Sequence, residues 1–75
     1  MRVTTVESTT LAVVVYDEAR ELLQLEFRSR TVYRYFGVPA RVHEGLLRAP
    51  SQGRYFNAEI RGRFRHARVG NAGEA

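Results

Sequence analysis

The chain has no cysteine, no lysine and no tryptophan among its 75 residues, and it has only two prolines. Without cysteine it forms no disulfide, no thiolate metal site and no thiol nucleophile. Its longest apolar run, Leu11–Tyr16, is too short to span a bilayer, and its start lacks the charged and then apolar pattern of a signal peptide. We therefore expect a cytoplasmic protein with no metal, no other cofactor and no membrane partner.

A chain of 75 residues has room for a single domain. The core of such a small domain rarely supplies more than about 3–5 kcal/mol of net stability. The hydrophobic share of 44% is typical of a globular protein and too high for a disordered one. A domain of this size is too small to enclose a substrate, so no small-molecule substrate is indicated.

All twelve basic residues are arginines, and they are unevenly distributed along the chain. Residues 1–27 carry two arginines and five acidic residues, a net charge of −3, whereas residues 28–75 carry ten arginines and three acidic residues, a net charge of +7. This asymmetry predicts a basic face or arm that a polyanion can bind.

Three segments have the pattern of β-strands, namely Leu11–Tyr16, Leu22–Arg28 and Thr31–Phe36. In the second segment Leu23, Leu25 and Phe27 alternate with polar residues, as in a strand with one solvent-exposed face. The third segment is rich in β-branched and aromatic residues, which favour strands. The three segments follow one another closely, so they predict an antiparallel meander.

The turn between the second and third segments decides which face of the sheet Tyr33 and Tyr35 take. A two-residue turn would direct both tyrosines outward, beside polar residues. A three-residue turn, with Arg30 in the left-handed conformation, would pair them with Leu25 and Leu23 on the apolar face. We favour the three-residue turn because it gathers the bulky apolar side chains on one side, although glycine fits a positive φ better than arginine does.

Two helices are expected after the third strand. Apolar residues recur at helical spacing over residues 39–49, and Pro50 ends this pattern. A second helix is expected over residues 52–61, with Phe56 and Ile60 on its inner face. Together these elements predict an α+β fold: a three-stranded antiparallel β-meander followed by two α-helices packed on one face.

The two ends of the chain have little to anchor them. Residues 1–7 are expected to form a polar N-terminal lead-in. Residues 65–75 contain too few apolar side chains to dock by themselves, so a flexible C-terminal tail is expected there.

No arrangement of reactive side chains predicts catalysis. His43-Glu44 lacks the second histidine of the zinc-protease pattern H-E-x-x-H, because Leu47 holds that position. His43 is expected at the surface or boundary of its helix. The glycines do not have the spacing of a phosphate-binding loop. We therefore expect no enzyme activity and no catalytic residue.

Tyr33-Arg34-Tyr35 has two interpretations. Aromatic side chains on a sheet can stack on the bases of RNA, and a small domain also needs large side chains to fill its core. The favoured turn supports core filling, with Arg34 facing outward.

Arginines near the second helix are the better functional candidates. Arg54, Asn57 and Arg61 are spaced as one stripe of a helix, opposite its apolar side, and Arg63 and Arg65 would continue as an adjoining arm. The planar guanidinium suits phosphate groups, although such a stripe can also be an ordinary solvated face. The candidate nucleic-acid-binding residues are Arg34, Arg54, Asn57, Arg61, Arg63 and Arg65.

Five short segments have an informative order. They are Ser8, VVYD (14–17), LQLEF (23–27), VYRYFGVP (32–39) and APSQGRYFNAEI (49–60). Their order and spacing resemble the KTSC domain, which is found at the C-terminus of some lysyl-tRNA synthetases and as small stand-alone bacterial or phage proteins. The resemblance covers residues 8–64, and its motif residues are Tyr33, Tyr35, Ser51, Gly53 and Phe56.

The resemblance implies no established activity and no catalytic residue. It implies RNA binding only through association with the synthetases. We therefore predict a small non-enzymatic binding module that binds nucleic acid, specifically RNA, through a basic helix face. The alternative is a protein–protein interaction or accessory module, in which the helices or a sheet edge meet a protein partner.

Overall fold

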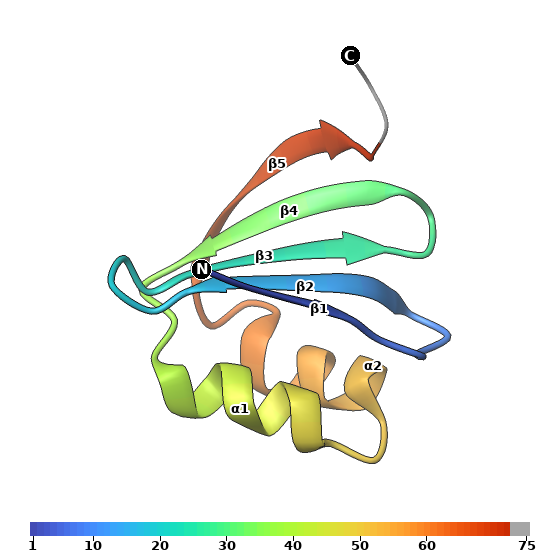
Figure 1. Cartoon of the computed structure of the whole chain (residues 1–75), viewed down its shortest axis with the longest axis horizontal. Coiled ribbons are helices and arrows are strands. Elements are labelled where there is room, and N and C mark those ends of the chain that lie inside the picture. Colours follow the sequence, from blue (N-terminus) through green and yellow to red (C-terminus); the bar gives the residue numbers. More distant parts are fainter. Residues whose placement is uncertain (73–75) are drawn as a thin grey trace.

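The structure is a computed structural model that describes residues 1–72. A five-stranded antiparallel sheet has its strands in chain order, and the helices cover one of its faces (Figure 1). The strands are β1 (Arg2–Thr5), β2 (Leu11–Asp17), β3 (Leu22–Phe27), β4 (Thr31–Phe36) and β5 (Arg65–Asn71). The helical elements are α1 (Ala40–Arg48), α2 (Gln52–Tyr55) and the π-helix η1 (Phe56–Ile60). Within the described residues, no element covers the opposite face of the sheet, which we call the open face.

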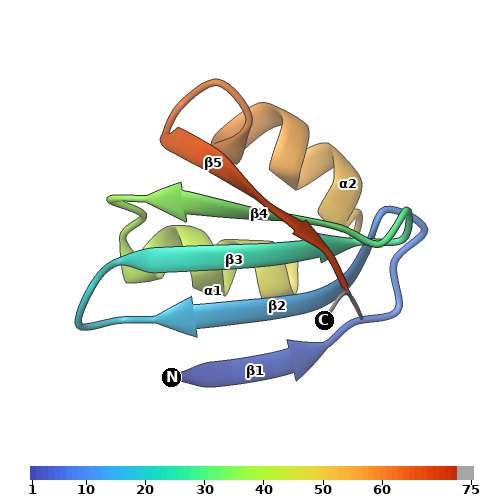
Figure 2. The same cartoon turned by 90° about the horizontal axis from the view of Figure 1, so that it is seen from above.

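The sheet has two more strands than the three expected from the sequence. The α+β class and the central meander are confirmed, but residues 2–5 form β1 at one edge and residues 65–71 form β5 at the other edge (Figure 2). Most residues of both edge strands are exposed. Backbone pairing with β2 and β4 holds them in place. The pattern of apolar residues in the sequence therefore gave no sign of either strand.

The turn between β3 and β4 has three residues, as the apolar pattern predicted. Arg30 has a φ of 75°, and its backbone N–H donates to the Phe27 carbonyl at 2.9 Å. Leu25 therefore pairs with Tyr33, and Leu23 pairs with Tyr35. Both tyrosines lie on the helix-covered face, where Tyr35 is buried and Tyr33 is half-buried.

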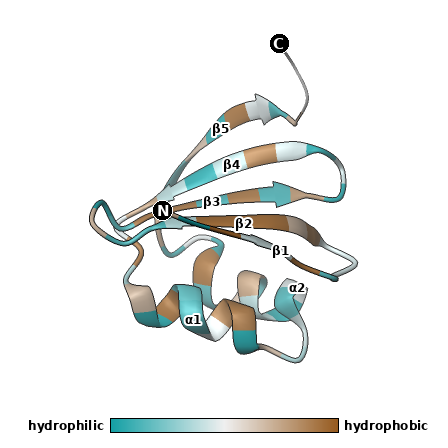
Figure 3. Cartoon of the chain, in the orientation of Figure 1, coloured by the Kyte–Doolittle hydropathy of each residue, from teal (hydrophilic) through white to brown (hydrophobic). Residues whose placement is uncertain are grey.

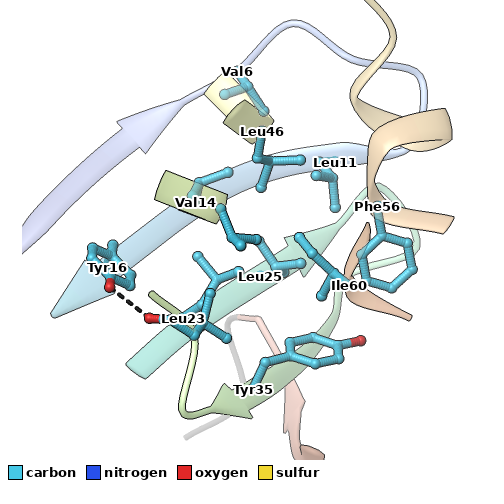
Figure 4. Close-up of a cluster of buried hydrophobic side chains, with 12 residues drawn as sticks. Val6, Leu11, Val14, Tyr16, Leu23, Leu25, Tyr35, Leu46, Phe56 and Ile60 are labelled. Atoms are coloured by element: carbon cyan, nitrogen blue, oxygen red, sulfur yellow. Dashed lines mark hydrogen bonds between the residues drawn. The ribbon is translucent and has the colours of Figure 1, made fainter. Parts of the chain in front are cut away.

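The core lies between the sheet and the helices (Figure 4). β2 is largely apolar and has no fully exposed residue, whereas α1 alternates apolar and polar bands (Figure 3), burying one side and exposing the other. Leu23 and Leu25 from the sheet meet Leu46 of α1 and Ile60 of η1, and all four are fully buried. The Tyr16 hydroxyl donates to the Val38 carbonyl at 2.6 Å, which satisfies the one polar atom of that buried ring.

His43 is buried, so the expectation of a surface or boundary position was wrong. Only 1% of its surface is exposed, and its ring stacks on Tyr16 with the centroids 4.4 Å apart. The residue lies on the same face of α1 as Leu46, three positions later, which points toward the sheet. Its Nε2 has no hydrogen-bond partner among the residues that the structure describes.

The second helix departs from the regular α-helix expected over residues 52–61. The Ser51 hydroxyl caps α2 by accepting from the Arg54 N–H at 3.3 Å. After a single α-helical turn, the chain continues as η1, in which the Arg61 N–H donates to the carbonyl of Phe56, five residues back. Phe56 and Ile60 are both buried, as predicted.

Candidate nucleic-acid interface

A cleft opens on the helix-covered side, between η1 and the strands β4 and β5. It has a volume of about 500 Å³ and is lined by four aromatic rings together with an arginine and a histidine. These side chains are Phe27, Tyr33, Tyr35, Phe56, Arg61 and His66. We call this site the aromatic cleft.

The register of the sheet places the rings of the aromatic cleft. Tyr33 and Tyr35 alternate with the outward-facing Arg34 on β4, and Phe27 ends β3 on the same face. The Phe56 ring packs edge-on against Phe27 and Tyr35, with centroids 5.2 and 5.8 Å away. Edge-to-face pairs of this kind are favourable, so the inner wall of the cleft is a fixed aromatic surface.

The π turn brings Arg61 to the cleft. η1 ends at Ile60, its last hydrogen bond spans five residues, and Arg61 itself is extended, with ψ 123°. Gly62 then adopts φ +77°, a left-handed conformation that favours glycine, and turns the chain back toward β5. The positive charge of Arg61 lies close enough to Tyr35 to act against the increase in the pKa of its hydroxyl.

His66 forms the outer wall of the cleft. β5 pairs with β4 so that His66 lies opposite Tyr35, and the two rings stack with centroids 5.6 Å apart and planes 30° apart. The imidazole also meets the Tyr33 ring edge-on at 5.9 Å. Sequence reasoning missed His66 because it placed residues 65–75 in a flexible tail.

Burial controls the chemistry of the Tyr35 hydroxyl. Desolvation, assisted by the neighbouring Tyr33, raises the pKa of Tyr35 to about 12, and Arg61 opposes the shift only in part. At neutral pH the hydroxyl is therefore protonated and can donate a hydrogen bond. Neither tyrosine hydroxyl in the cleft has a hydrogen-bond partner among residues 1–72, so both are available to a ligand.

The six predicted nucleic-acid-binding residues are divided between two faces of the molecule. Arg54, Asn57 and Arg61 are exposed on the helix-covered side. Arg34 and Arg65 lie on the open face, where Arg34 donates to the Gln24 side chain at 2.9 Å and Arg65 lies 5.4 Å from the centre of the Phe36 ring. The structure therefore does not bring these two arginines together with the other candidates.

The stripe on the second helix is also less regular than expected. The π turn adds a residue to the helical repeat, so Arg61 borders the aromatic cleft while Arg54 borders a separate hollow beside Tyr55 and Glu59. Neither guanidinium makes a hydrogen bond or ion pair within the described part of the chain. Arg63, by contrast, donates to the Ala58 carbonyl at 2.9 Å, which fixes the turn after η1.

The motif residues have structural roles. Ser51 caps α2, and Phe56 and Tyr35 are buried beside the cleft. Gly53 allows α2 to approach the loop before β2, because a Cβ at this position would lie 2.5 Å from the Thr10 hydroxyl. Tyr33 differs from the others, since it is half-buried and presents part of its ring to the cleft.

The described residues contain no group of three or more histidine, cysteine or acidic side chains that could hold a metal ion. Among residues 1–72, no helix has the length and apolar character needed to cross a membrane.

Comparison with known proteins gives consistent results. Residues 7–64 match the KTSC domain family. A lysine–tRNA ligase from Trichormus variabilis is 43% identical over 54 residues, which are 72% of this chain and 10% of that protein. A protein from Tsukamurella paurometabola is 40% identical over 60 residues, which are 80% of this chain and 90% of that protein. A crystal structure of a KTSC domain protein from Yersinia pestis superimposes with a TM-score of 0.88 at 33% identity, covering 92% of this chain and 97% of the other.

The fold and the cleft define a small α+β domain with one antiparallel sheet and helices on a single face. The chain belongs to the KTSC domain family. It spans about a tenth of the length of the lysine–tRNA ligases that it matches, so the resemblance to them concerns one domain of a much larger protein.

Proposed function

We propose that this domain is a non-enzymatic module that binds single-stranded RNA on its helix-covered side, through exposed arginines beside the aromatic cleft. The proposal rests on the position of Arg61. Its guanidinium has no protein partner among the described residues, and it borders a cleft lined with aromatic rings. Arginine beside aromatic rings is a common combination in proteins that bind single strands.

Charge supports a polyanionic partner. None of the described residues that line the cleft is acidic, and residues 28–75 carry a net charge of +7. The similarity to a domain of lysine–tRNA ligases, proteins whose name specifies an RNA, supports RNA as the class of polyanion. Arg54, Asn57 and Arg61 would contact the sugar–phosphate backbone, which gives weak binding that depends on salt and little on sequence.

The test is the affinity for a short single-stranded RNA as a function of salt concentration, measured by fluorescence anisotropy. The variant Arg54→Gln/Arg61→Gln should flatten the log–log salt dependence by roughly 1.4, because two phosphate contacts contribute about 0.7 each. The matched control is Arg34→Gln/Arg65→Gln, which removes the same charge from the open face and should keep most of the slope. If the wild type fails to bind at low salt, or if both variants lose the same slope, the proposal is wrong.

A protein partner is the second candidate, and the open face favours it. Val3 is 67% exposed there, and Val15 and Leu22 line a small hollow on the same face together with Asp17, Gln24 and Arg34. Exposed apolar side chains on an uncovered sheet are typical of protein interfaces. Partners that remain bound in a pull-down after nuclease treatment would favour this candidate over RNA.

A further inference from the structure

We infer that the aromatic cleft receives one unpaired nucleobase of the bound RNA, held against the accessible surfaces of the Tyr33 and His66 rings, with Arg61 at an adjacent phosphate. This inference rests on the proposed function and names the part of the ligand that the cleft recognises. It adds base contacts to a surface that would otherwise bind only the backbone.

The rings leave a surface for stacking. Tyr35 and Phe56 are almost completely buried and form the floor of the cleft. Tyr33 is half-buried and His66 is exposed, so these two rings keep accessible surface at the opening. A volume of about 500 Å³ accommodates a flat base, and base–aromatic stacking tolerates any base because each has a π-face.

The polar groups of the cleft suit a base better than an apolar side chain. The Tyr33 and Tyr35 hydroxyls have no hydrogen-bond partner among the described residues. Figure 4 shows Tyr35 beside Phe56 and Ile60, with its hydroxyl at the end of the ring that points away from Leu23. A purely apolar guest would displace the water bound to these hydroxyls and offer no hydrogen bond in its place. The edge of a base carries acceptors for them.

The charge at the cleft suits the phosphate that accompanies a base. Arg61 is the only arginine among the described lining residues, and it borders the opening on the η1 side. Its exposed guanidinium can approach a phosphate while the base enters the cleft. The hollow beside Arg54, by contrast, contains the acidic Glu59 and only one aromatic ring. It therefore suits a phosphate and a base less well than the aromatic cleft does.

The experiment compares two ligands of equal charge: a mixed-sequence RNA hexamer with all four bases, and the same sugar–phosphate chain without bases. Wild-type protein should bind the hexamer more tightly than the abasic chain by roughly 5- to 150-fold, the range expected for one stacked base. Tyr33→Leu and His66→Leu should each remove most of this preference. Tyr33→Phe keeps the ring and should retain most of the preference, losing only the hydrogen bond of the hydroxyl.

The matched control is Phe36→Leu, which removes an aromatic ring from the same strand on the open face and should leave the preference unchanged. A second measurement follows the ring-proton resonances of Tyr33 and His66, which should shift upfield with the hexamer and not with the abasic chain. Equal binding of both ligands by the wild type would refute the base site while leaving the backbone-binding proposal in place. No binding of either ligand would refute both.

Discussion

Tyr35 and Tyr33 belong to the same family motif, yet they differ in burial and in their position relative to the aromatic cleft. Tyr35 is 4% exposed and contacts Phe56 and His66, so its ring is part of the core. Tyr33 is half-buried and lies at the opening of the aromatic cleft. The prediction that both rings are mainly buried on the helix-covered side is confirmed for Tyr35, whereas Tyr33 lies on that side but is only half-buried.

Tyr35→Ala should reduce the free energy of unfolding by roughly 3–5 kcal/mol, because it deletes a large buried aromatic side chain and leaves a cavity. A loss of this size is comparable with the whole stability of so small a domain. Thermal denaturation followed by circular dichroism measures it. Tyr33→Ala is the control and should cost less, since part of that ring is already exposed. An unchanged melting temperature in Tyr35→Ala would contradict the placement of the ring in the core.

His43 makes stability depend on pH. Burial lowers the pKa of His43, Arg2 lowers it further, and Glu44 and Glu18 oppose the shift. The unfolded chain therefore takes up a proton at higher pH than the folded protein does. The stabilising contribution is complete above the unfolded value of about 6.5 and is lost as the pH falls from there through the lowered folded-state pKa.

Urea denaturation of the wild type between pH 5 and 7.5 should show stability falling toward the acidic end. His43→Phe keeps an aromatic ring against Tyr16 but cannot take up a proton, so its stability should change less over this range. His66 is present in both proteins and does not affect the comparison. If the two proteins show the same pH dependence, His43 is not the titrating group.

Two elements at the level of secondary structure define the candidate site. The π turn of η1 ends the helix early enough for Arg61 to reach the cleft, and β5 supplies His66 as the outer wall. β5 is held by pairing with β4 along six positions, and by Arg30, which exchanges backbone and side-chain hydrogen bonds with Ala72 at 2.7 and 2.8 Å. Without this strand the aromatic cleft would have no outer wall.

Amide hydrogen exchange should therefore protect the backbone N–H groups of β5 that face β4. Protection should be weaker than in β3, because most β5 side chains are exposed and little apolar surface is buried by the strand. The measurement is residue-resolved exchange by NMR. Exchange at unprotected rates throughout residues 65–71 would show that this segment behaves as the flexible tail suggested by its composition.

At the level of the whole molecule, the sheet separates two surfaces of different character. The helix-covered side carries the aromatic cleft with Arg54, Asn57 and Arg61, whereas the open face carries Arg34 and Arg65. A single strand of RNA lying on one side does not contact both groups of arginines. The arginine-to-glutamine pairs therefore distinguish binding to a defined face from attraction to the overall positive charge.

The sequence by itself determined the α+β class, the three central strands and the burial of Phe56 and Ile60, and it favoured the observed register of the β3–β4 turn. Local rules are sufficient for these features, because side-chain alternation and turn length decide which residues share a face. It also carried the motifs that indicate the family, which the match over residues 7–64 confirms.

Only the tertiary structure decided the edge strands, the burial of His43 and the composition of the aromatic cleft. β1 and β5 are stabilised by backbone hydrogen bonds to a neighbouring strand, and such bonds leave no apolar pattern in the sequence. The cleft combines Phe27, Tyr33, Arg61 and His66 from separate parts of the chain. Their proximity depends on the sheet order and on one additional residue in a helical turn, neither of which residue spacing alone can specify.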